Sequence, residues 1–234
     1  MPAAPRKKAR PLAIAPSTKE QLVLTAERLF AIHGLDGVSL RQISAEAGNA
    51  NNSAVQYHFG SKEQLVQAIF EYRIPAIARR RRILAAQLPS DDLRSCVEMY
   101  LLPVLEEAED VDNYYLSFLM QLQHYGMSGH PFSQLPEEFQ LPTLEFLQRV
   151  SEFLVDVPES LRFTRTTQAL SICTHLAADR QLARRHNVAV FPFGLHVAEL
   201  LDGVIGFLTA PASKATLESL PGTPIATRWR LALP

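Results

Sequence analysis

The stretch that most constrains the fold runs from Ser39 to Lys62 and reads SLRQISAEAGNANNSAVQYHFGSK. Ser39 and Gln42 fit the S/T-x-x-E/Q capping box, in which each side chain pairs with a free amide at the start of a helix. The same spacing recurs at Ser61 and Gln64, and Gly48 can end a helix in the left-handed conformation. The stretch therefore predicts a short helix, a turn, a second short helix and the start of a third, which is a helix-turn-helix.

Apolar and polar residues of this stretch fall on different helical faces. Leu40, Ile43 and Ala47 share one face of the first helix, while Val55 and Phe59 give the second helix an apolar stripe. The remaining side chains of the second helix are expected to face outward: Asn52, Ser53, Gln56, Tyr57 and His58. Asn and Gln can pair with adenine, and hydroxyl groups can reach phosphates. This face therefore suits DNA, although a solvated helical hairpin without DNA function has the same pattern.

A further helix precedes this motif. Residues Thr18 to Gly34 have apolar side chains at helical spacing and end in a glycine. Together with the run Tyr57-His58-Phe59-Gly60-Ser61-Lys62-Glu63, the arrangement resembles the N-terminal DNA-binding domain of the tetracycline-repressor-like (TetR/AcrR) family of transcriptional regulators. The resemblance covers residues 17–72. Between Gly48 and Phe59 the chain is one residue longer than the commonest form of the motif, which leaves the register of Asn49 to Asn52 open.

The resemblance implies roles for individual side chains of the motif. Arg41 would reach a base or a phosphate, and bases would be read by Asn52, Ser53 and Gln56. Backbone phosphates would be contacted by Ser39, Tyr57, His58 and Lys62. The positive end of a helix dipole disfavours a lysine in the first turn unless an anion is bound, so a phosphate explains Lys62 better than solvation does. For His58, packing against the neighbouring helix is the alternative.

The formal net charge of −1 hides an uneven distribution of charge. Residues 1–87 contain thirteen Lys or Arg against six Asp or Glu, a net charge of +7, whereas residues 88–234 contain ten against eighteen, a net charge of −8. A DNA-binding head on a body that does not bind DNA is expected to show this asymmetry, because neutralised phosphates supply most non-specific affinity. Residues 1–16 form a basic arm, with Arg6, Lys7, Lys8 and Arg10, that either follows the DNA backbone or solubilises the chain.

After residue 89 the chain reads as helices separated by proline, glycine and charged turns. Helices are expected at residues 91–108, 112–125, 136–154, 159–186 and 193–208. A helix that begins at Ser61 connects head and body and is expected to run past Pro75 towards Gln87. Pro75 should kink or break it, and the arginines from Arg79 to Arg82 spread around it in different directions. We therefore expect an all-α chain with a flexible arm (1–16), a three-helix helix-turn-helix domain (17–72), a larger helical effector-binding and dimerisation domain (73–210) and a tail (211–234).

The last two long helices carry more apolar surface than a single stripe. In the family that the head resembles, these helices pair with their two-fold mates in a four-helix bundle, which implies a homodimer. Its interface is predicted at Leu170, Cys173, Ala177, Val197, Leu201, Val204, Ile205 and Leu208. The alternative is that both helices are internal core.

The other body helices contain aromatic residues and a few polar tips, a mixture typical of a small-molecule cavity between helices. The candidates for this effector pocket are Tyr100, Tyr114, Tyr115, Phe118, Gln121, His124 and His175. Each of them, taken singly, is more often a core residue. No cofactor or metal site is predicted, because the histidines and cysteines lack the spacing of metal ligands, and Cys96 and Cys173 are expected to be free thiols.

These observations predict a homodimeric, ligand-responsive transcriptional repressor that binds a palindromic double-stranded DNA operator and is released by a small apolar or aromatic effector. The chain is expected to be cytoplasmic, because it contains no apolar segment of membrane-span length and no secretory signal. The alternative is a helical enzyme or small-molecule-binding protein without DNA function. An enzyme is disfavoured because the sequence lacks a nucleophile elbow, a phosphate-binding glycine loop and a recognisable catalytic arrangement.

Overall fold

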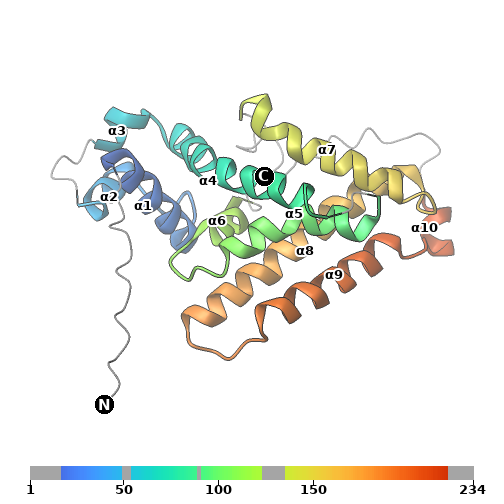
Figure 1. The fold of residues 1–234 in the computed structure, drawn as a ribbon. Helices are drawn as coiled ribbons and strands as arrows, with labels where there is room; N and C mark the ends of the chain where they lie inside the picture. The colour runs from blue at the N-terminus through green and yellow to red at the C-terminus, as the bar shows by residue number, and fades with distance from the viewer. Residues whose placement is uncertain (1–16, 49–53, 89–90, 123–134, 221–234) are drawn as a thin grey trace, which may run out of the picture.

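Ten α-helices make up the part of the chain that this computed structural model describes, which is residues 17–48, 54–88, 91–122 and 135–220. They are α1 (Thr18–His33), α2 (Leu40–Glu46), α3 (Ala54–Phe59), α4 (Lys62–Ala85), α5 (Leu93–Glu107), α6 (Tyr115–Leu122), α7 (Glu137–Phe153), α8 (Glu159–Arg185), α9 (Phe193–Thr209) and α10 (Lys214–Glu218). No strand occurs among the described residues, so the predicted all-α class is confirmed. Figure 1 shows α1, α2 and α3 gathered in a small head, from which α4 leads into a larger body.

Side-chain caps fix where the head helices begin. The Ser39 hydroxyl accepts a hydrogen bond from the Gln42 amide at 3.2 Å, and the Gln42 side chain accepts one from the Ser39 amide at 2.8 Å, so the predicted capping box of α2 is present. At the start of α4, the Ser61 hydroxyl accepts from the Gln64 amide at 3.3 Å. A further capping box, formed by Ser17 and Glu20, begins α1 and is absent from the predictions. Each cap stabilises its helix by about 1 kcal/mol.

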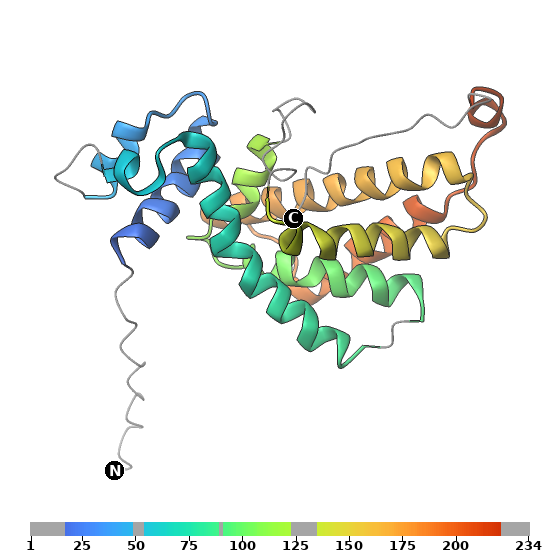
Figure 2. The same ribbon diagram turned by 90° about the horizontal axis from the view of Figure 1, so that it is seen from above.

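Helix α4 continues past Pro75 to Ala85, as the sequence predicted, and of the two predicted effects of Pro75, a kink or a break, the break does not occur. Pro75 removes the amide partner of the Glu71 carbonyl. Both residues are exposed, so water can satisfy that carbonyl. On the opposite side, Ile74 and Ile77 are buried and hold the helix against its neighbours on either side of the proline. One unbroken helix therefore connects head and body, as Figure 2 shows from above.

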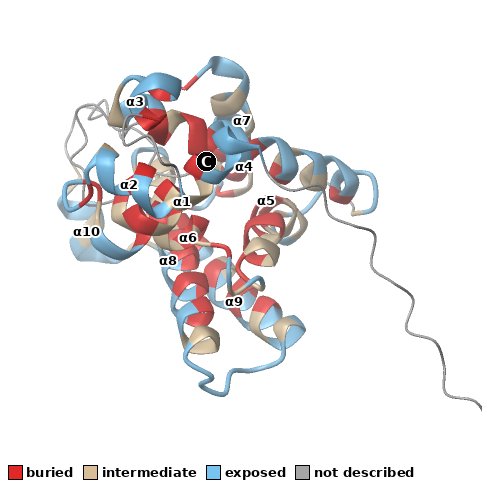
Figure 3. Cartoon of the chain, turned by 90° about the vertical axis from the view of Figure 1, so that its left-hand side faces the viewer, coloured by how far each residue is buried: buried red, intermediate tan, exposed pale blue. Residues whose placement is uncertain are grey.

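Head and body share one apolar core. Helix α1 packs against α4 and α6, while α8 packs against α6, α7 and α9, and α5 packs against α4, α7 and α9. The buried residues, red in Figure 3, lie on the facing sides of these helices. None of the described helices combines the length and the apolar character of a membrane span. The contact of α1 with α6 places the head directly against the body rather than on a linker.

The residues predicted for the dimer interface lie inside the chain. Leu170, Cys173, Ala177, Leu201, Val204 and Leu208 are between 1% and 4% exposed, Val197 is 8% exposed and Ile205 is half-buried. They pack the α8–α9 hairpin on itself and on the other body helices. The seven buried side chains are therefore taken up by packing within the chain, whereas the homodimer predicted on α8 and α9 stays a prediction. The spacing of apolar residues could not separate core from interface positions, because α9 is apolar around most of its circumference.

Candidate DNA-binding surface and effector site

Helix α3 turns its apolar side chains inward and its polar side chains outward, as predicted. Val55 and Phe59 are buried, whereas Gln56, Tyr57 and His58 are exposed, Tyr57 to 84%. The His58 ring stands edge-on to the Tyr57 ring, with 5.1 Å between their centres, so His58 is not packed beneath a neighbouring helix. Asn52 and Ser53 lie outside the described residues. The outer face of α3 therefore presents adjacent amide, phenol and imidazole groups, which can meet base edges and phosphates.

A buried serine holds α3 against α2. Ser44 is 0% exposed, and its hydroxyl donates to the Leu40 carbonyl and accepts from the Val55 amide, both at 3.2 Å. The Val55 amide belongs to the first turn of α3, where amides have no partner within the helix. Ser44 therefore caps α3 from the neighbouring helix and fixes the angle between the two helices. The sequence gives no signal for this role, because a serine beside Ile43 looks like any small helical residue.

Three predicted DNA contacts flank this face, and they differ in whether they already bond to other residues of the chain: Arg41, Ser39 and Lys62. Arg41 is exposed in the first turn of α2, where it is open to a base or a phosphate. The Ser39 hydroxyl and amide are both engaged with Gln42. The Lys62 ammonium donates to the Leu35 carbonyl at 2.7 Å, so it ties the start of α4 to the turn between α1 and α2. This carbonyl is a partner that the sequence did not suggest, and it offsets the unfavourable position of a lysine at a helix start.

Two of the predicted pocket residues form a buried aromatic group with Phe70. Tyr115 and Phe118 are both 0% exposed with ring centres 6.3 Å apart, and Phe70 lies 6.3 Å from the first ring and 5.8 Å from the second. The Tyr115 hydroxyl is buried and has no hydrogen-bond partner. Burial raises the pKa of Tyr115 well above its ordinary value, so this hydroxyl stays protonated. A buried hydroxyl left unpaired costs about 1–3 kcal/mol, which a bound polar group could recover.

Tyr100 belongs to a second buried group, which it forms with α7. Its ring stacks on Phe146 with 3.9 Å between ring centres, and its hydroxyl lies 2.8 Å from the Thr143 hydroxyl. Arg81 lies over the Tyr100 ring at 3.8 Å and donates to the Tyr100 carbonyl at 3.1 Å. Burial raises the pKa of Tyr100 as well. Arg81 therefore contacts the body helix α5. The sequence predicted that the four arginines point in different directions, but it did not predict this contact.

Of the remaining predicted pocket residues, the three that the structure describes do not join these two groups. Tyr114 is half-buried beneath Arg185, whose guanidinium lies 3.7 Å from the ring centre. The Gln121 side chain donates to the Ala31 carbonyl of the head at 3.3 Å. His175 is 58% exposed on α8, with its Nε2 atom 3.4 Å from Asp179, so it lies on the outside of the body. His124 lies outside the described residues.

The two cysteines are buried free thiols, as the sequence suggested. Burial raises the pKa of Cys96 to about 11 and the pKa of Cys173 to about 12. Both groups are therefore protonated and unreactive near neutral pH. Within the described ranges, no three His, Cys, Asp or Glu side chains gather in a cluster that could hold a metal ion.

The head matches a known protein family. Residues 18–69, which hold α1 to α3 and the first part of α4, fit the sequence profile described as bacterial regulatory proteins, tetR family. The head is thus a tetR-family domain. Its exposed α3 face and the flanking Arg41 lie within the matched residues. A head of this family makes the chain a DNA-binding transcriptional regulator, a class distinct from the enzymes.

Solved structures share the fold of this chain over most of its length. The fatty acid degradation regulator FadR from Bacillus halodurans is 15% identical with a TM-score of 0.56, covering 86% of this chain and 97% of that chain. A putative tetR family transcription regulator from Shewanella sp. PV-4 is 21% identical with a TM-score of 0.54, covering 85% of this chain and 100% of that chain. AmtR from Mycobacterium smegmatis is 14% identical with a TM-score of 0.50, covering 87% and 92%. No curated protein sequence gives a significant match.

Proposed function

We propose that this tetR-family protein is a cytoplasmic, homodimeric repressor that binds a palindromic operator and is released by a small apolar or aromatic effector. The observation that carries the DNA-binding part is the exposed row of Gln56, Tyr57 and His58 on a helix anchored through Ser44. A glutamine can bond adenine through two hydrogen bonds, and hydroxyl and imidazole groups can bond phosphates. Arg41 supplies positive charge beside this row.

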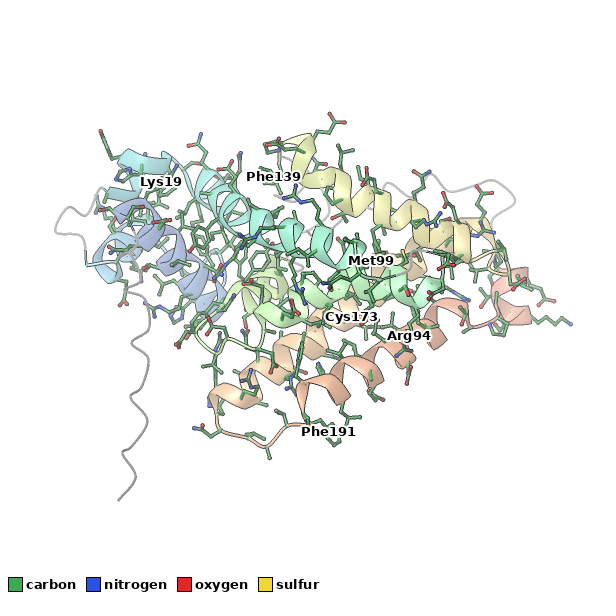
Figure 4. The ribbon with its side chains drawn as sticks, in the orientation of Figure 1. Lys19, Arg94, Met99, Phe139, Cys173 and Phe191 are labelled. Atoms are coloured by element: carbon green, nitrogen blue, oxygen red, sulfur yellow. The ribbon has the colours of Figure 1, made fainter. Side chains whose placement is uncertain are left out.

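Exposed apolar side chains on α8 and α9 support a dimer. On α8, Ile172 is 42% and Leu176 is 43% exposed; on α9, Leu195 is 51% and Phe207 is 36% exposed. At Gly203 and Gly206 an added Cβ would meet nothing within 4 Å, so another helix could approach closely there. Phe191, labelled in Figure 4, extends this apolar surface at the turn between α8 and α9 and is 69% exposed. Pairing two copies across these positions would remove that surface from water.

The Tyr115 hydroxyl supports an effector site in the body. It is buried and unpaired, and the ring that carries it lies against the rings of Phe70 and Phe118, so it suits an apolar ligand with one polar group. Helix α6, which carries Tyr115 and Phe118, also packs against α1 of the head. A ligand that moves α6 would therefore move the head. A ligand can weaken DNA binding only by its difference in affinity for the two arrangements, which is typically about 5- to 150-fold.

Selection of DNA from a random duplex library tests the DNA-binding part. We expect the full chain to enrich an inverted repeat, and we expect Gln56→Ala to lose preference at one base of each half-site. Enrichment of no sequence by the wild type would contradict the proposal.

The effector part is tested with the selected operator. A thermal-shift screen of apolar and aromatic compounds should yield ligands that lower operator affinity, and the operator should weaken their binding by the same factor. Tyr115→Phe, which removes only the unpaired hydroxyl, should weaken those ligands without weakening DNA binding. Ligands that bind the body and leave operator affinity unchanged would contradict release by an effector.

A further inference from the structure

Glu27 is a buried carboxylate on α1 of the head. It is 1% exposed, and Arg73 of α4 donates two hydrogen bonds to it, from Nε to Oε2 and from Nη2 to Oε1, each at 2.7 Å. The backbone amide of Tyr114, at the entrance to α6, donates to Glu27 Oε1 at 3.1 Å. One carboxylate of the head is therefore bonded both to α4 and to the segment that leads into α6.

Arg73 extends this set of contacts to the end of α5. Its Nη1 atom donates to Glu107 Oε2 at 3.3 Å, and the Asn113 side-chain amide donates to the same oxygen. Burial lowers the pKa of Arg73, but the hydrogen bonds to Glu27 and the charges of Glu27 and Glu107 outweigh it and leave the pKa above its ordinary value. The guanidinium therefore stays charged and joins α1 to α5.

The connection between α5 and α6 is in turn held by α8. Gln181 is 0% exposed, and its side-chain amide donates to the carbonyls of Asp110 at 2.9 Å and Asn113 at 2.7 Å. Arg185 donates from Nε to the Val111 carbonyl at 2.6 Å and stacks over the Tyr114 ring at 3.7 Å. The Tyr114 ring thus contacts Arg185 of α8, while the Tyr114 amide is bonded to Glu27 of α1. Arg185 and Tyr114 together link α8 to the head.

These contacts are directional, unlike the apolar packing around them. The hydrophobic effect that drives apolar packing has no preferred direction. A bidentate pair of arginine and carboxylate has one preferred geometry. A buried ion pair adds little net stability compared with apolar packing, and its better-attested use is to specify one arrangement among several. The Glu27 pair is therefore suited to fixing the angle of the head relative to α8.

We propose that Glu27, Arg73, Tyr114 and Arg185 set the distance between the two recognition helices of the dimer, and so select the half-site spacing of its operator. This rests on the dimeric DNA-binding function proposed above, in which exposed side chains of α8 form part of the contact between the two copies. One added base pair moves a half-site by about 3.4 Å and turns it by about 35° around the DNA axis. Heads held rigidly to α8 reject such a shift, whereas loosely held heads accept it.

Selection from random duplex DNA, read for the spacing between inverted half-sites, tests this proposal. The wild-type chain is compared with two variants. Glu27→Gln keeps the shape of the side chain and removes its charge. Arg185→Met removes the contact between the Arg185 guanidinium of α8 and the Tyr114 ring. The wild type should select one dominant spacing. Both variants should select the same half-site sequence at several neighbouring spacings. For each variant we compare selection at the best half-site spacing with selection at a spacing that is longer by two base pairs. The ratio of the two should fall about tenfold from its wild-type value, as expected when a charge-assisted hydrogen bond is lost.

The matched control is Glu106→Gln. Arg80 holds Glu106 with two hydrogen bonds of 2.7 Å each, so this pair repeats the Glu27 geometry, but it joins α4 to α5 without contacting α1. This variant should select the wild-type spacing. Arg185 lies outside the core of the head, so Arg185→Met remains a test if Glu27→Gln does not fold. The proposal is overturned if the folded variants select the wild-type spacing as sharply as the wild type does. If the wild type itself enriches no inverted repeat, the dimeric DNA-binding function fails, and the proposal fails with it.

Discussion

Replacing Ser44 with alanine should loosen the recognition helix without changing any side chain that faces DNA. The substitution removes the acceptor of the Val55 amide and leaves that amide in a buried position. A neutral hydrogen bond contributes about 0.5–1.5 kcal/mol, and an amide left unpaired raises the cost to about 1–3 kcal/mol. The loss of one oxygen atom creates little empty volume, so this unpaired amide dominates the expected change.

Calorimetry and DNA titration measure the two consequences of Ser44→Ala. For a chain of this size each kcal/mol lowers the Tm by about 2–4 °C, so a decrease of about 2–12 °C is expected. If binding must reorder α3, operator affinity falls by at most the same free energy, which is about 5- to 150-fold. The control is Thr209→Ala, whose exposed hydroxyl donates to the Ile205 carbonyl in its own helix and should matter little. Equal Tm and equal DNA affinity for Ser44→Ala and the control would refute the anchoring role.

Three further outcomes follow from the structure. Gln56→Ala should reduce the binding free energy for the selected operator by about 1–3 kcal/mol and leave binding to random DNA unchanged. Lys62→Met should weaken binding to both DNAs, and it should also lower the Tm because the Leu35 carbonyl loses its donor. Gel-shift titrations distinguish these two patterns. Ile172→Arg should give folded monomers by light scattering and circular dichroism, while Val204→Arg should unfold the chain by burying a charge in its core; persistence of the Ile172→Arg dimer argues against the proposed face. Because burial raises the pKa of Cys96 to about 11 and of Cys173 to about 12, both thiols should react with a disulfide reagent at mildly alkaline pH only after denaturation, and rapid labelling of the native protein would be inconsistent with their burial.

Local signals were sufficient to predict most of the helices. Caps such as Ser39 with Gln42, and apolar spacing such as Val55 with Phe59, act within one helix and are visible in the sequence. The predicted ranges of α7, α8 and α9 accordingly agree with the structure to within one or two residues. The sequence also predicted that the helix beginning at Ser61 runs past Pro75 towards Gln87, but it did not predict α10, because a short capped turn has no distinctive pattern.

Contacts between distant residues were beyond the sequence. Glu27 and Arg73 are 46 positions apart, and each alone resembles a solvated helical charge. Lys62 is 27 positions from the Leu35 carbonyl, so its donor role could not be separated from a phosphate contact. Burial in the folded chain likewise decided which apolar face of α9 is internal, and it moved the candidate dimer surface from Val204 to side chains such as Phe207. Which partner a side chain meets is set by packing between helices rather than by spacing along one helix.

The salt dependence of binding to a labelled duplex tests the central claim that the basic, tetR-family head binds DNA. Each phosphate that the protein neutralises contributes about −0.9 to the slope of log K against log salt concentration. We predict a negative slope of several units for the wild type, with a magnitude smaller by about one unit in Lys62→Met. An absence of binding at low salt, or a slope near zero, would contradict DNA binding by the head.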